Sequence, residues 1–161
     1  MQMRSWKPAR GAVTPVTTIP ASPTDGQAVL HTPSGVTLIW NGSAWASMSP
    51  GVTIHANPGG IAAPCAVTLV DAALVVTDPD VHDRSDGFVS AVIDDDLVAV
   101  TRDGEVGGFV GLTPTEPVYV APDGSGGVVH SPDDTLNVIP MGYALSATRV
   151  MARMDTGTGY G

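Results

Sequence analysis

The stretch GFVSAVIDDDLVAVTRDGEVGGFVGL, residues 87–112, decides the fold class of this chain. Its three runs rich in Val, Ile, Leu and Phe lie at residues 87–93, 97–102 and 107–112. Each run is too short for a typical helix, and turn-forming residues separate it from the next: aspartates at 94–96 and glycines within 104–108. The stretch therefore predicts successive β-strands, joined by a polar turn at 94–96 and a hairpin turn at 104–108.

Short runs of the same kind continue on both sides of this stretch. Gly, Pro or Asp separates them, and they occupy residues 52–56, 66–76, 118–121, 127–130, 137–140 and 143–154. The chain of 161 residues holds 19 Gly and 14 Pro but only two Glu and one Lys, so strand and turn formers outnumber helix formers. These features predict an all-β fold, a small β-barrel or β-sandwich.

Two windows lack Gly and Pro for long enough to form a helix, residues 65–78 and residues 143–156. The first is rich in valine, which favours a strand. The second is rich in alanine, so it could hold a turn of helix.

The chain divides into four parts. Residues 1–23 contain four prolines and no helical or strand period, which predicts an extended N-terminal arm. Residues 24–50 predict a small β-meander with tryptophans, and residues 51–154 the barrel or sandwich body. We expect residues 155–161 to form a flexible C-terminal tail.

Within the meander, strands are predicted at residues 28–31 and 36–40, and Asn41-Gly42 is a strong hairpin signal. Trp40 and Trp45 flank this turn. Because they are five residues apart, we expect them on opposite faces of a regular pairing, one of them in the core.

Charge is distributed unevenly along the chain, whose formal net charge is −9. Three of the seven basic residues, Arg4, Lys7 and Arg10, lie in the first ten positions, and 14 of the 16 acids lie between Asp71 and Asp134. An acidic body repels phosphate backbones, so we do not expect nucleic acid as a partner. We expect no membrane partner, because no apolar run approaches about 20 residues. We expect no export signal either, because Pro15, Pro20 and Pro23 stand where a signal peptide needs an apolar core.

The segment from Asp78 to Asp86 is the cluster that most resembles a ligand set. Its carboxylates at positions 78, 80, 83 and 86 could surround calcium, but it lacks the glycine and the flanking helices of a helix–loop–helix calcium site. The pattern favours a solvated acidic loop. We predict no metal site and no cofactor, because the histidines are scattered and the lone Cys65 reads as a small buried hydrophobe.

No catalytic residue is predicted. The chain has no Gly-x-Ser-x-Gly elbow, and its glycine-rich segments at 104–108 and 123–127 precede strands rather than the helix that a phosphate loop requires. Spacing alone does not rule out a carboxylate pair for sugar hydrolysis, but aromatic residues make up only 5%, which leaves little material for stacking on sugars.

Several segments resemble virion proteins of tailed bacteriophages. One pair, PASPTDGQAVL at 20–30 and TLIWNGSAW at 37–45, is similar to small β modules of phage fibres and appendages. The other segments, RDGEVGGFVGLTP at 102–114, PVYVA at 117–121 and MGYALSAT at 141–148, are similar to a β module of head-decoration and head-fibre proteins. The pattern departs at Thr115-Glu116, where glycine is expected after the proline.

The resemblance implies a non-enzymatic virion protein on the capsid exterior, made in the host cytoplasm and often homotrimeric. Its expected partners are the major capsid protein or other virion subunits, bound through the arm by Arg4, Trp6, Lys7 and Arg10. Self-association would cover strand edges and apolar residues such as Val52, Ile54 and Leu145. The alternatives are a tail, baseplate or receptor-binding fibre adaptor, a glycan-cleaving virion enzyme or other hydrolase, and an unrelated β-rich binding domain.

Overall fold

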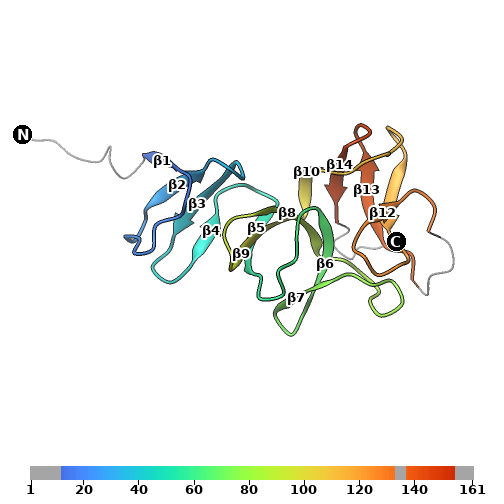
Figure 1. Ribbon diagram of the computed structural model, residues 1–161, viewed down its shortest axis with the longest axis horizontal. Coiled ribbons are helices and arrows are strands. Elements are labelled where there is room, and N and C mark those ends of the chain that lie inside the picture. Colours follow the sequence, from blue (N-terminus) through green and yellow to red (C-terminus); the bar gives the residue numbers. More distant parts are fainter. Residues whose placement is uncertain (1–11, 133–136, 155–161) are drawn as a thin grey trace, which may run out of the picture.

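The computed structural model describes residues 12–132 and 137–154, and in these ranges the chain is all-β, as predicted. Its strands form three sheets, here called sheets A, B and C, which follow one another along the chain. Figure 1 shows them arranged in a row, with sheet A at one end and sheet C at the other. None of the sheets in the described ranges closes into a barrel, so the arrangement is that of packed open sheets.

Sheet A has four strands in sequence order, and two of them have the predicted bounds. These strands are β1 (Val13–Val16), β2 (Ala28–His31), β3 (Val36–Trp40) and β4 (Trp45–Ser47). Strand β1 lies within the range 1–23 that was predicted as an arm, but it pairs in parallel with β2 of the same chain. The pattern did not indicate it, because β1 contains Pro15 and its side chains are largely exposed.

Trp40 and Trp45 lie on the same face of sheet A, so the prediction of opposite faces is wrong. They are directly paired across β3 and β4, with ring centroids 5.5 Å apart and an interplanar angle of 64°. Side chains of directly opposed residues share a face. The connection that brings them together is a four-residue turn in which Asn41 Oδ1 accepts hydrogen bonds from the backbone N–H groups of Ser43 and Ala44, both at 3.0 Å.

Sheet B has five strands in the order β5-β9-β8-β6-β7. They are β5 (Val52–Ala56), β6 (Cys65–Val70), β7 (Ala73–Val76), β8 (Gly87–Val92) and β9 (Leu97–Thr101). The window 65–78 is β-structure as predicted, but as two strands that turn at Asp71 and Ala72, with φ angles of 51° and 68°. Neither residue is the glycine or asparagine that usually marks such a turn.

Sheet C has the order β10-β14-β13-β11-β12. Its strands are β10 (Asp103–Gly107), β11 (Pro117–Val120), β12 (Val128–Val129), β13 (Pro140–Ala144) and β14 (Arg149–Arg153). The turn predicted at 104–108 is wrong, because most of it forms β10, and the strand predicted at 107–112 is a loop beyond Gly107. The alanine-rich window from residue 143 forms the end of β13, a turn and β14, with no helix in its described part.

Two hydrophobic cores join the sheets. One packs Ala66 and Phe88 of sheet B against sheet C, and the rings of Phe88 and Phe109 meet at 5.3 Å. The other packs Trp45 of sheet A against the β8–β9 hairpin of sheet B. Val52 and Ile54 contribute to this second core and are half-buried, so the expectation that they are exposed is wrong, whereas Leu145 is 36% exposed.

Thr115 occupies the position where the resemblance predicts glycine, and its backbone has the conformation that glycine favours. Its φ is 72°, and the N–H of Glu116 donates to the carbonyl of Thr113 at 3.2 Å. Pro114 and Thr115 are therefore the central residues of a tight turn.

Candidate functional site

The predicted partner-binding residues Arg4, Trp6, Lys7 and Arg10, and the predicted tail at 155–161, lie outside the described residues. The described chain begins immediately before β1, at the end of the molecule away from sheet C (Figure 1). Because β1 is an edge strand of sheet A, the basic segment joins the body at that edge.

The acidic segment 78–86 is not a solvated loop throughout. Asp78 begins a local turn, in which its Oδ1 accepts from the N–H of Asp80 at 3.0 Å and its own N–H donates to His82 Nδ1 at 2.9 Å. Asp86, in contrast, is only 5% exposed. The described residues contain no group of three His, Cys, Asp or Glu side chains that could hold a metal ion.

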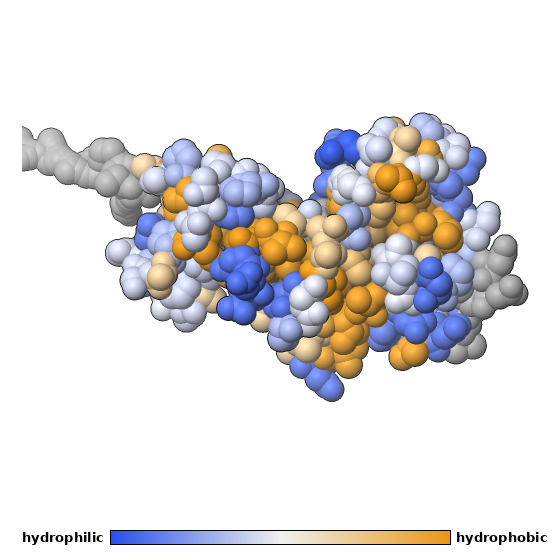
Figure 2. All heavy atoms as spheres, in the orientation of Figure 1, coloured by the Kyte–Doolittle hydropathy of each residue, from blue (hydrophilic) through white to orange (hydrophobic). Residues whose placement is uncertain are grey.

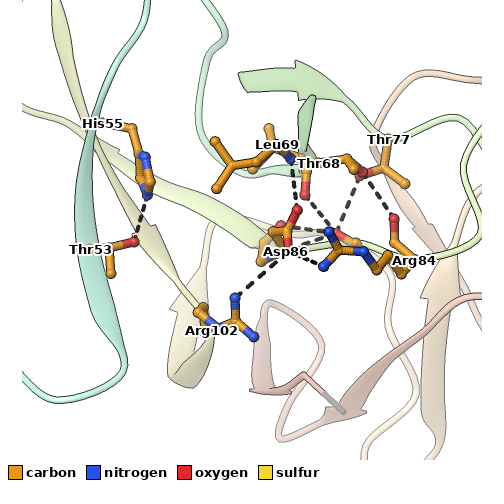
Figure 3. A network of polar contacts seen from close by, with 11 residues as sticks. Thr53, His55, Thr68, Leu69, Thr77, Arg84, Asp86 and Arg102 are labelled. Carbon is orange, nitrogen blue, oxygen red and sulfur yellow. Dashed lines mark hydrogen bonds and ion pairs between the residues drawn. The ribbon is translucent and has the colours of Figure 1, made fainter. Parts of the chain in front are cut away.

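Asp86 is the centre of a buried polar network (Figure 3). Its Oδ1 accepts from Arg84 Nη1 at 2.7 Å, and its Oδ2 accepts from the backbone N–H of Leu69 at 2.7 Å. Strand β6 pairs with β8 only as far as Val67, so the N–H of Leu69 has no partner on β8. The Asp86 carboxylate accepts the hydrogen bond of this N–H instead. Arg102 Nη1 lies farther away, at 3.7 Å from Asp86 Oδ1.

A chain of buried hydroxyl groups fixes the segment that carries Asp86. The hydroxyls of Thr68 and Thr77 lie 2.8 Å apart, and Thr68 donates to the carbonyl of Arg84 at 3.0 Å. Ser85 Oγ donates to the carbonyl of Val67 at 2.9 Å. Buried polar groups that are all hydrogen-bonded hold a segment in a single arrangement.

A cavity of about 100 Å³ lies beside this network, between strand β5 and the β6–β7 hairpin. It is lined by Thr53, His55, Leu69, Leu74, Asp86, Val100 and Arg102. The Thr53 hydroxyl and His55 Nε2 lie 2.8 Å apart on β5. Burial lowers the pKa of His55, and the negative charge of Asp86 opposes this shift more weakly.

A larger cleft of about 380 Å³ lies where the three sheets meet. Figure 2 shows the surface hollowed between the part that contains sheet A and the part that contains sheet C. Its polar lining includes Ser34, Ser49, Ser90, Thr101, Glu105 and Arg149. Arg149 Nε donates to Glu105 Oε1 at 2.8 Å, but both side chains are about half exposed, so the pair contributes little to stability.

Three hydroxyl groups that line this cleft are hydrogen-bonded within the fold. Ser90 Oγ accepts from the Thr101 hydroxyl at 2.8 Å and donates to the carbonyl of Ala99 at 3.3 Å. Ser34 also lines the cleft, and its Oγ lies 2.7 Å from Nδ1 of His31, an imidazole that is not itself part of the lining.

The other histidines mainly hold turns. His31 Nδ1 lies 2.7 Å from Ser34 Oγ, and His130 Nε2 accepts from the N–H of Thr113 at 2.9 Å. Cys65 is buried as predicted, and burial raises the pKa of its thiol. The predicted turn at 123–127 is confirmed, and the Ser125 hydrogen bonds to Asp123 lower the pKa of that exposed carboxyl.

Sequence reasoning missed both the cavity and the cleft, because each collects side chains from three or more strands. A weak signal was present in the sequence: Arg84 and Arg102 are the only cations between residues 11 and 148, and both lie beside Asp86 in the fold.

Comparisons of the chain with protein-family models, with curated proteins and with solved structures returned no match. In the described part of the chain, no helix has the length and apolarity needed to cross a membrane.

Proposed function

We propose that this protein is a structural component of a tailed-phage virion that decorates or stabilises the capsid exterior, as a head-decoration or head-fibre base protein. It binds the major capsid protein or another virion subunit through Arg4, Trp6, Lys7 and Arg10, and it associates as a homotrimer. It is made in the host cytoplasm, carries no catalytic residue, and has neither nucleic acid nor membrane as a partner.

The observation that carries the proposal is the polarity of charge along a row of three sheets. The first eleven residues hold three cations and no acid, and residues 12–50, which contain sheet A, hold a single charged side chain, Asp25. Residues 51–102, which contain sheet B, hold eight acids and two arginines. A basic segment attached at one end of an acidic body suits a protein that is tethered there to an acidic shell, with its body in solvent.

The geometry of the polar groups agrees with a role in binding rather than in catalysis. In the described residues the buried carboxylate of Asp86 is hydrogen-bonded to backbone and guanidinium groups, and the Thr101 hydroxyl donates to Ser90 Oγ, which donates to backbone. Such groups stabilise the fold.

The proposal is tested by binding to phage particles assembled without the protein. The native chain should co-sediment with the particles, and binding should weaken as salt rises, because exposed charge pairs are screened over about 8–10 Å. A variant lacking residues 1–11 and the triple variant R4E/K7E/R10E should both lose binding.

The matched control is R149E/R153E, which reverses two charges on sheet C and should bind like the native chain. Equal binding by the native chain and by the variant without residues 1–11 would refute the tether. Release of reducing sugar or peptide from host envelope by the purified protein would refute the non-enzymatic role.

A further inference from the structure

The guanidinium group of Arg102, whose side chain is 38% exposed, lines the cavity beside Asp86. Arg84 makes a 2.7 Å hydrogen bond to Asp86, whereas Arg102 comes no closer than 3.7 Å to the same oxygen. The Arg102 side chain makes no hydrogen bond to any other described residue, although it lines the cavity. A guanidinium group presents five N–H donors in a planar fork, so Arg102 has donors available for a ligand.

Asp86 and Arg102 line the cavity, and Arg84, whose side chain is 66% exposed and outside the lining, pairs with Asp86 from the solvent side. Both Asp86 oxygens are occupied, one by Arg84 and the other by the backbone N–H of Leu69. Two guanidinium groups therefore face one carboxylate, and His55 is neutral near pH 7 because burial lowers its pKa. A ligand with one negative charge would balance the site, whereas a phosphate dianion would reverse its sign.

The shape of the cavity restricts the rest of the ligand. Leu69, Leu74 and Val100 make its walls apolar, and its volume of about 100 Å³ holds only a few heavy atoms. The Arg102 backbone is held on both sides, since its N–H donates to the Gly51 carbonyl at 2.6 Å and its carbonyl accepts from Met154 at 3.1 Å. Figure 3 shows His55 and Thr53 on one strand, with Arg102 and Asp86 across from them.

We propose that this cavity binds a single carboxylate group carried on a short aliphatic stem. The carboxylate pairs with the fork of Arg102, the pair of His55 and Thr53 provides a further polar contact, and the stem packs against the leucine and valine walls. Two sources share this chemistry: a free small carboxylate, and an aspartate or glutamate side chain of another protein chain. The site does not depend on a virion role.

The first arm of the test is an NMR titration of the native full-length chain with propionate at fixed ionic strength and pH. Binding in the millimolar range should shift the amide signals of the residues that line the cavity. Propionamide, which has the same shape without the charge, should leave them unchanged. These amide shifts are measured on the native protein, so the result does not depend on the folding of any variant.

Two variants test whether Arg102 is the residue that pairs with the carboxylate of propionate. R102Q should weaken propionate binding about tenfold or more, because it removes a charge-assisted pair. R149Q removes one positive charge from the separate three-sheet cleft and should bind like the native chain. The proposal is overturned if propionate leaves the cavity amides unshifted, if propionamide shifts them equally, or if R102Q binds as tightly as R149Q.

The second arm identifies the source of the carboxylate. Sedimentation velocity of the native chain is measured with and without saturating propionate. If propionate dissociates an oligomer that R102Q also fails to form, the occupant is an acidic side chain of a second copy. If sedimentation is unchanged while propionate binds, the occupant is a free carboxylate or an acidic side chain of a different protein, and acidic peptides then distinguish these two.

Discussion

His55 shows how burial of one residue couples stability to pH. Burial lowers its pKa below the ordinary value of 6.5, so the unfolded chain takes up a proton at a higher pH than the folded chain does. The stability that neutral His55 contributes is therefore fully present above about pH 6.5 and decreases as pH falls from that value through its lowered pKa. We expect the free energy of unfolding, measured by urea denaturation, to fall over this range.

The variant H55Q separates this effect from the carboxylates that titrate at lower pH. Its free energy of unfolding should change less than that of the native chain between pH 7 and the lowered pKa of His55. If the free energy of unfolding fell equally with pH in H55Q and in the native chain, His55 would not be the group responsible.

Gly126 shows how one residue position can depend on the absence of a side chain. Its φ is 79°, and a Cβ there would collide with Cys65 Sγ and lie 2.9 Å from Val76 Cγ1. Gly111 has a similar φ of 70° but open space around it. Both changes to alanine cost backbone strain, but G126A also overpacks the core, so it should be less stable than G111A by about 1–3 kcal/mol.

Denaturant unfolding of both glycine variants measures this difference. Removing the sulfur in C65A/G126A should recover part of the loss, because the collision with Sγ disappears. Equal stabilities of G126A and G111A would contradict this prediction, because they would show that Cys65 and Val76 move aside without cost.

At the scale of elements, the turn of the β6–β7 hairpin contains Ala72 in a backbone conformation that favours glycine. Ala72 has a φ of 68°, which costs a non-glycine residue about 1–2 kcal/mol. A72G should therefore raise the free energy of unfolding by about 0.5–1 kcal/mol, and A73G, one residue later in the strand, should lower it by a similar amount. Thermal and urea unfolding check both values, and the same sign for both variants would contradict the turn geometry.

The strands that could be predicted from sequence are those with local signals at both ends. β2, β3 and β5 have the predicted bounds, because clear turn residues or glycines flank their apolar runs. The turn at Asp71-Ala72 carried only a single aspartate as a signal, with no glycine or proline beside it. The glycines at 104–108 predicted a turn, but Gly104 and Gly107 lie inside strand β10. Arg149 Nη1 occupies the space that a side chain at Gly107 would need.

The candidate site could not be predicted from local patterns in the sequence. No motif in the sequence indicated a nucleophile elbow or a phosphate loop, but no local pattern indicated that Asp86 would be buried beside Arg102 either. Arg102 comes beside Asp86 through the register of the β8–β9 hairpin, in which Phe88 pairs with Thr101. The burial of Asp86 depends on the order of strands in sheet B, which places β6 and the N–H of Leu69 beside the start of β8. Sheet order is a property of the whole fold and leaves no spacing in the sequence.

At the scale of the whole molecule, the sheets are joined by shared cores rather than by linkers. Ile93 and Ala99 of sheet B pack with Trp45 of sheet A, and Phe88 of sheet B packs with sheet C. In the proposed function, attachment at the N-terminal end holds the whole row of sheets on the particle, because the shared cores join each sheet to the next. Binding only to the assembled particle then stabilises that particle by mass action.

A head-decoration protein covers the outside of the phage head. Immunogold electron microscopy of intact virions, with an antibody raised against the purified chain, locates the protein on the particle. We expect gold particles distributed over the whole head, and none on virions assembled without the protein. Label confined to the tail tip would instead indicate a tail or receptor-binding adaptor, and intact virions without any label would contradict a place on the virion surface.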